Sequence, residues 1–168
     1  GGGFPVKEII RVAMADLGIA RAPAILMTIG LGSCVGVTLY DPLLKLGGLA
    51  HIMLPYQRKG SAGGKPGKYA DQAIAYLLDE LTAQGAVKGR LEAKLVGGAQ
   101  MFANKGSETS EILKVGQRNV EAARKILGEI GIKIVAADTG GNYGRTIELE
   151  TETGALRIKT IAHGEKYI

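Results

Sequence analysis

The stretch Thr28-Ile29-Gly30-Leu31-Gly32-Ser33-Cys34 ends at the only cysteine of this 168-residue chain. An apolar run, Ala24 to Ile29, leads into it, and a second run, Val35 to Tyr40, follows it. Both runs are short and apolar and are bounded by glycine, proline or other turn-forming residues, which is typical of strands. We therefore predict two strands joined by a loop of small residues, and the rest of the chain is organised around this connection.

The chain turns at Asp41-Pro42 and returns through another predicted strand, Leu46 to Leu54, which carries His51. If Asp41 to Leu44 forms a four-residue turn, the antiparallel register places Cys34 directly opposite His51. Directly opposed residues have Cβ atoms about 5 Å apart and side chains on the same face. The register thus predicts a thiol within reach of an imidazole, and a slip of one residue would separate the two.

A cysteine beside a histidine is typical of nucleophilic catalysis, since the imidazole lowers the thiol pKa and shuttles its proton. A third group usually orients the imidazole. Thr28 offers a hydroxyl for this role, whereas Asp41 is the more usual type but lies far from His51 along the turn. Backbone N–H groups of the Gly30 to Ser33 loop are placed to form an oxyanion hole. An inert, buried Cys34 and a merely structural Thr28 remain open alternatives at this point.

The remainder of the chain predicts more strands and two helices. One helix opens at Pro66 and stops at Gly85, and the other begins at Val115 and stops at Gly131, each with apolar residues at helical spacing. We predict an α+β fold, a layered α/β sandwich with a mixed β-sheet, as a single domain over residues 1–168, with Gly1 to Gly3 interpreted as a cloning remnant. The further predicted strands are Glu8 to Ala15, Leu91 to Val96, Ile132 to Ala137, and a hairpin of Thr146 to Glu150 with Ala155 to Ile161.

Composition argues against several classes of protein. The net charge is +5, but no dense basic run carries interleaved aromatics, and aromatics are only 5% of the chain, so we expect no nucleic-acid partner. No apolar run approaches the roughly 20 residues of a membrane span, and no signal peptide is evident, so we expect no membrane insertion. A single cysteine excludes an internal disulfide and favours the cytoplasm.

Two rival site types are not supported by spacing. Gly30-x-Gly32 lacks the third glycine of a dinucleotide fingerprint, because Val35 stands there and a β-branched run follows where a helix is needed. Cys34, His51 and His163 have no metal-ligand spacing, so we expect no metal and no cofactor.

Several blocks together resemble the CheD family, the chemoreceptor glutamine deamidases of bacterial and archaeal chemotaxis. They occur in the family's order and span about Ile25 to Arg145, with no departure at the positions of the nucleophile, base and orienting residue. The blocks are Thr28 to Cys34, Asp41-Pro42, Ala50 to Pro55, Lys65 to Asp71, Gly97 to Phe102, Gly116 to Asn119, Asp138 to Asn142 and Gly144-Arg145.

The resemblance implies a fold similar to the catalytic domain of cytotoxic necrotising factor toxins, with a Cys–His–Thr catalytic triad. Cys34 would be the nucleophile, His51 the base and Thr28 the orienting residue. It implies hydrolysis of glutamine side-chain amides to glutamate on the cytoplasmic helices of chemoreceptors, and binding to CheC, a phosphatase of the response regulator CheY. Long substrate helices suggest a shallow cleft, with the loops around Ser61, Gln100 and Asn142 as its expected rim.

Two other functions remain open from the sequence. One is an adaptor module that binds CheC and receptors, with catalysis secondary. An intact Cys34, His51 and Thr28 favours the enzyme, because an adaptor has no need of a triad. The other is a thiol hydrolase with a small-molecule substrate, which would need a closed pocket.

Overall fold

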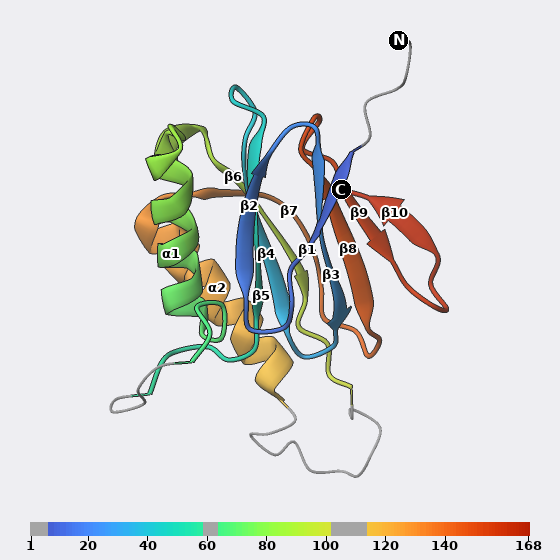
Figure 1. Ribbon diagram of the computed structural model, residues 1–168. Coiled ribbons are helices and arrows are strands. Elements are labelled where there is room, and N and C mark those ends of the chain that lie inside the picture. The colour runs from blue at the N-terminus through green and yellow to red at the C-terminus, as the bar shows by residue number, and fades with distance from the viewer. Residues whose placement is uncertain (1–6, 59–63, 102–113) are drawn as a thin grey trace.

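The computed structural model describes residues 7–58, 64–101 and 114–168, which form three layers (Figure 1). Two helices lie against one five-stranded sheet, and a second five-stranded sheet covers its other face. The strand orders are β2-β5-β4-β6-β7 in the middle sheet and β1-β3-β8-β9-β10 in the outer sheet. The elements are β1 (Glu8–Arg11), β2 (Leu17–Arg21), β3 (Ala24–Leu31), β4 (Val35–Asp41), β5 (Leu46–Ile52), α1 (Ala70–Ala83), the 3₁₀ turn η1 (Lys88–Arg90), β6 (Glu92–Gly97), α2 (Val115–Ile130), β7 (Lys133–Thr139), β8 (Arg145–Glu150), β9 (Leu156–Lys159) and β10 (Glu165–Tyr167).

This arrangement confirms the predicted layered α+β fold with mixed strand pairing and two main helices. The pairs β1–β3 and β6–β7 are parallel, and the other paired strands are antiparallel. What the sequence pattern did not resolve is that the strands divide into two sheets. The similarity to cytotoxic necrotising factor toxins stays a prediction.

The strands β4 and β5 form the centre of the molecule, because every residue in both is buried. Helices cover one face of these strands and the outer sheet covers the other, so their sequences are almost continuously apolar or small. Successive side chains alternate between the two interiors: Leu49 belongs to the cluster between the sheets, and Ala50 to the cluster under the helices. His51 therefore follows Leu49 into the layer between the two sheets.

Two glycines in β5 allow both neighbouring layers to approach the strand. A Cβ placed on Gly47 would lie 2.8 Å from Leu149 Cδ2 of the outer sheet, and one on Gly48 would lie 2.7 Å from Leu77 Cδ1 of α1. Both distances are shorter than any normal carbon–carbon contact. The absence of side chains here lets the three layers pack closely around β5.

The helices agree with the predicted periodicity, with one difference in a boundary. In α1 the buried residues recur at helical spacing, but the helix begins at Ala70 and not at Pro66. Tyr69 still has extended dihedrals, and Leu54 and Tyr69 form an isolated bridge that holds this segment in extended form. α2 ends as expected at Gly131, whose φ of 91° only glycine adopts readily.

The register between β4 and β5 differs from the predicted one by two residues. Asp41 pairs with Leu46 and Gly36 pairs with His51, so Cys34 is not directly opposite His51. The reason is the turn: β4 includes Asp41, and the connection closes through Lys45 at a φ of 52°. Because the slip is even, the period-two alternation still directs Cys34 and His51 to the same face.

The predicted strand Glu8 to Ala15 is also wrong in its extent. β1 stops at Arg11, and the chain turns at Ala15, which has a φ of 66°, before entering β2. β1 pairs with β3 in the outer sheet, whereas β2 pairs with β5 in the middle sheet. The turn thus carries the chain from one sheet to the other. The predicted hairpin after residue 145 is confirmed as β8 and β9, and β10 extends it.

Asp41 has a structural role at the end of β4 opposite from Cys34. Its side chain is fully buried and accepts hydrogen bonds from Arg90 and from the backbone N–H groups of Leu43, Leu44 and Val87. Burial raises the pKa of Asp41, but the bonds from Arg90 and the backbone outweigh it and hold the pKa below its usual range. The carboxylate is therefore charged and anchors the turn.

We expect Arg90→Met to lower the free energy of unfolding by about 2 kcal/mol near neutral pH, since it removes the charged donor of a buried carboxylate. A depressed pKa stabilises the fold above the unfolded value near 4 and loses that effect as pH falls through the folded value. The difference between variant and wild type should therefore shrink below about pH 4. Urea unfolding at several pH values measures it. Lys88→Met, at an exposed position in the same turn, is the control, and an equal loss there would contradict the role of Arg90.

Candidate functional site

The three predicted site residues come from three successive strand segments and meet the same interior layer. Thr28 lies on β3 of the outer sheet, His51 lies near the end of β5 in the middle sheet, and Cys34 directly precedes β4. All three are buried, with relative exposures of 1%, 0% and 7%. The site is thus built between the two sheets and not on the outer surface of either.

A hydrogen bond between the sheets fixes the orientation of His51. Thr28 Oγ1 lies 2.7 Å from His51 Nδ1 and also 2.7 Å from the carbonyl oxygen of Val12. The carbonyl can only accept, so the single hydroxyl proton of Thr28 is donated to Val12. Thr28 Oγ1 must then accept from Nδ1–H, which assigns the neutral tautomer with a bare Nε2.

The bare Nε2 of His51 is a buried acceptor without a hydrogen-bond partner among the described residues. Buried polar atoms are nearly always paired, and an exception requires an explanation such as a role in catalysis. Burial lowers the pKa of His51 to about 4, because the imidazolium form is poorly solvated between the sheets. His51 is therefore a neutral imidazole with an available lone pair at neutral pH.

Cys34 shares this layer but does not form a hydrogen bond with His51 in the part of the chain that the structure describes. Burial raises the pKa of the Cys34 thiol. This contradicts the expectation that a neighbouring histidine lowers it. The same cause acts on both groups, since burial disfavours the thiolate and the imidazolium alike. Both pKa shifts favour the uncharged forms, a neutral thiol and a neutral imidazole.

The loop that carries Cys34 is tied to the loop that follows β6. Gly98 N–H donates to Cys34 O at 2.9 Å, and Ala99 N–H donates to Gly32 O at 2.8 Å. The approach is possible because residue 97 is glycine: a Cβ there would lie 2.4 Å from Cys34 O, and its φ is 109°. Gly97 and Gly98 therefore allow the loop after β6 to approach the Cys34 loop and bond to it.

Asn119 is the residue that reasoning from the sequence missed. Its side chain on α2 is fully buried, and Nδ2 donates to Ser33 O and to Met53 O, both at 2.9 Å. One acceptor precedes Cys34, and the other follows His51 by two residues. The only signal in the sequence was its place in the resemblance block that begins at Gly116, which gave no role.

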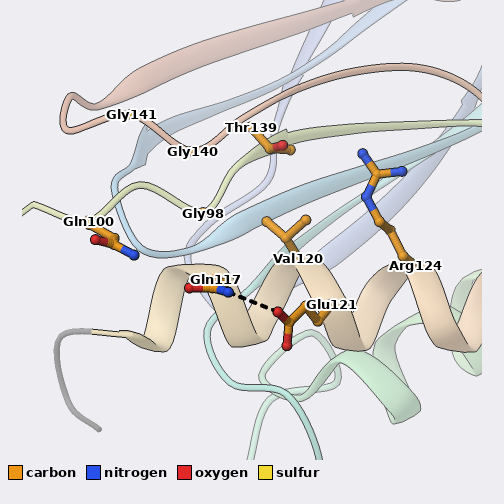
Figure 2. Close-up of a pocket in the computed structure, with 9 residues that line it drawn as sticks. All are labelled: Gly98, Gln100, Gln117, Val120, Glu121, Arg124, Thr139, Gly140 and Gly141. Carbon is orange, nitrogen blue, oxygen red and sulfur yellow. Dashed lines mark hydrogen bonds between the residues drawn. The ribbon is translucent and has the colours of Figure 1, made fainter. Parts of the chain in front are cut away.

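A cleft of about 520 Å³ lies beside this loop cluster, between α2 and two glycine-rich turns (Figure 2). Gln100 lines this cleft, and its N–H donates to Gly141 O at 2.9 Å; its role at the rim of the Cys34 site stays a prediction. Asn142 is exposed in the adjoining turn, and its rim role stays a prediction; Ser61 and Phe102 lie outside the described residues. Thr28, Cys34 and His51 do not line this cleft. Its lining is Gly98, Gln100, Gln117, Val120, Glu121, Arg124, Thr139, Gly140 and Gly141.

The described residues offer neither a metal-binding cluster nor a membrane-spanning helix. Over residues 7–58, 64–101 and 114–168, no group of three or more His, Cys, Asp or Glu side chains is placed to hold a metal ion. His163 stacks on Tyr143, with ring centroids 3.9 Å apart, and is not brought to Cys34 and His51. No described helix has the length and apolar character required to cross a bilayer.

The tautomer and the low pKa of His51 can be measured directly. In ¹⁵N-labelled protein we expect His51 to show the Nδ1–H neutral tautomer and to stay neutral from pH 8 down to pH 5, because its pKa is about 4. Thr28→Val should remove the tautomer preference, whereas Thr28→Ser keeps the hydroxyl and should preserve it. His163→Gln assigns the remaining histidine signals. A His51 ring that titrates near pH 6.5 would contradict the buried, neutral site.

Residues 53–160 match the family model described as CheD chemotactic sensory transduction. A relative from Caldanaerobacter subterraneus subsp. tengcongensis, named probable chemoreceptor glutamine deamidase CheD, is 54% identical over 162 residues, covering 96% of this chain and 99% of that protein. Chemoreceptor glutamine deamidase CheD of Halalkalibacterium halodurans is 48% identical, covering 97% of this chain and 100% of that protein. The probable deamidase of Pyrococcus horikoshii is 46% identical, covering 95% and 96%.

Among solved structures, the hypothetical protein YfiH of Bacillus licheniformis aligns with a TM-score of 0.46 at 16% identity. The alignment covers 74% of this chain and 49% of that chain, and so weak a likeness supports no argument about function. The sequence relatives, by contrast, match over nearly their whole length at about half of all positions. The family match, which covers well over half of the chain, agrees with them, and the chain belongs to the CheD family.

Proposed function

We propose that this protein is a chemoreceptor glutamine deamidase that hydrolyses glutamine side-chain amides to glutamate. The names of its relatives support the activity and the class of substrate. The observation that carries the proposal on this chain is the buried His51, whose tautomer leaves Nε2 free in the same layer as Cys34. A buried imidazole with a bare, unpaired nitrogen is suited to take a proton from a thiol.

The reaction begins from a neutral pair. As Cys34 Sγ attacks the carboxamide carbon, the S–C bond forms and the thiol proton passes to His51 Nε2, while the carbonyl electrons move onto oxygen. Catalytic hydrogen bonds are often long in a resting enzyme and tighten in the complex, which is how we account for the unformed Cys34–His51 bond. The imidazolium is stabilised by Thr28 Oγ1, which accepts from Nδ1–H.

Collapse of the tetrahedral intermediate breaks the C–N bond, and the Nε2 proton leaves with ammonia. The product is a thioester on Cys34. His51 Nε2 then takes a proton from water, the hydroxide adds to the thioester carbon, and the S–C bond breaks to release glutamate. The thiol regains its proton from His51. No cofactor enters this sequence of steps.

The oxyanion of both intermediates needs hydrogen-bond donors beside the sulfur. The backbone N–H groups of Ser33 and Cys34 have no acceptor within the described part of the chain. Free N–H groups next to a nucleophile are the usual components of an oxyanion hole. We assign this role to the loop from Gly32 to Cys34.

Partners follow from the same proposal. The substrate would be the cytoplasmic helices of chemoreceptors, which would place the reaction in the cytoplasm, and CheC is the second proposed partner. The adaptor function predicts binding to CheC and to receptors without dependence on Cys34. A small-molecule thiol hydrolase would require a closed pocket at Cys34 and His51, and neither residue lines the cleft beside α2.

The proposal is tested by incubating the protein with a chemoreceptor cytoplasmic fragment and following peptide masses for conversion of glutamine to glutamate. We expect activity in the wild type and none in Cys34→Ala. His51→Gln should lower kcat by about 10²–10⁴-fold, the usual contribution of a general base. Thr28→Val should lower kcat at least about tenfold through loss of the tautomer, and Thr28→Ser should stay close to wild type.

The outcomes separate the enzyme from the adaptor. If wild type and Cys34→Ala leave the same glutamines unchanged, the deamidase proposal fails for that receptor. Retained CheC binding by both proteins would then support the adaptor. Equal activity of Thr28→Val and Thr28→Ser would contradict the role of Thr28 while leaving the reaction itself in place.

A further inference from the structure

Asn119 joins the two segments that carry the proposed nucleophile and base. Its Nδ2 bonds to Ser33 O and Met53 O, and no other side chain within the described ranges bonds to the backbone of residues 30–34 or 50–54. The two acceptors flank different strands of the middle sheet, with Ser33 just before β4 and Met53 just after β5, and Asn119 lies on the helix packed against that sheet. The amide therefore acts as a clamp from α2 onto the loop before β4 and the end of β5.

The orientation of this amide is determined by its partners. Both Ser33 O and Met53 O are acceptors, so the NH₂ group must face them, and a flipped amide would place oxygen against oxygen. Oδ1 is consequently left buried without a hydrogen-bond partner among the described residues. An unpaired buried oxygen lowers stability. The placement of Asn119 is thus better explained by what its two N–H groups hold in position than by stability alone.

One of the two N–H groups holds the peptide plane between Ser33 and Cys34. Ser33 C=O and Cys34 N–H belong to the same planar, trans peptide group, so they point in opposite directions. By binding the carbonyl, Asn119 fixes the direction of the N–H on the other side of that plane. This N–H lacks an acceptor in the part of the chain that the structure describes and belongs to the residue that carries Sγ.

We propose that Asn119 is a positioning residue that orients the Ser33–Cys34 peptide, so that Cys34 N–H donates to the oxyanion formed when Sγ attacks the amide carbon. The inference rests on the proposed deamidase function. Asn119 does not touch the substrate, and its bond to Met53 O anchors the amide while the other N–H holds Ser33 O. It acts on the oxyanion and not on the thiol–imidazole proton transfer.

The test compares two reactions of the same thiol. Deamidation forms an oxyanion, whereas alkylation of Cys34 by iodoacetamide displaces iodide and forms none. For Asn119→Asp, a nearly isosteric change that removes the NH₂ donors, and for Asn119→Ala, we expect kcat to fall by about 10–100-fold, up to the loss seen for one oxyanion donor. KM and the alkylation rate should stay within about threefold of wild type. Asn119→Gln retains an NH₂ group and should recover part of kcat.

Glu129→Ala, at an exposed position near the end of α2, is the matched control and should leave both reactions unchanged. Alkylation and deamidation that fall together in Asn119→Asp would overturn the proposal, since they would indicate general support of the site. An unchanged kcat would also overturn it.

A second readout does not depend on activity. In Asn119→Asp we expect faster hydrogen exchange by NMR of the Gly98 and Ala99 amides, which donate to Cys34 O and Gly32 O and so report whether the Cys34 loop stays in place. Glu129→Ala should exchange as the wild type does, and unchanged exchange at Gly98 and Ala99 in Asn119→Asp would overturn the clamp. If the wild type fails to deamidate any receptor fragment, the proposed function fails, and the exchange measurement alone decides whether Asn119 fixes the peptide.

Discussion

The hydrogen bond from His51 to Thr28 crosses the gap between the two sheets, and the site depends on that crossing. It requires β3 and β5 to face each other at one spacing, since the two atoms lie 2.7 Å apart. It also requires the carbonyl oxygen of Val12 to accept the hydroxyl proton of Thr28. Val12 directly follows β1, so its position depends on where the chain leaves that strand. The tautomer of one imidazole is thus decided by three segments from two sheets.

Burial between the sheets gives this site a particular electrostatic character. Desolvation raises the pKa of Cys34 and lowers that of His51, so both groups rest uncharged. A preformed thiolate–imidazolium pair would face a high desolvation cost in such an interior. Charge therefore develops only during the reaction, where donors fixed beforehand are most effective. Fixed backbone N–H groups near Cys34 are consistent with that requirement.

The sequence predicted the parts of the fold and site that depend on local chemistry or on period-two alternation. The end of α2 at Gly131 follows from glycine's freedom at positive φ. The prediction that Cys34 and His51 share a face is correct although the predicted register was wrong, because the error was an even number of residues. Contacts between layers were not predictable from the residues alone. Thr28 meets His51 from another sheet, and Asn119 reaches Met53 from 66 residues away along the chain, so neither leaves a local pattern.

The paired glycines at positions 47 and 48 bear on how this fold can be engineered. Replacing glycine by alanine commonly raises stability, because it reduces the conformational entropy of the unfolded chain by about 0.4–1 kcal/mol. In β5 this route is closed, since an added methyl group would press on Leu149 on one side and Leu77 on the other. Any displacement of the outer sheet would also change the distance from Thr28 to His51. Substitutions that raise the thermal stability of this fold therefore belong outside β5, and positions 47 and 48 should remain glycine.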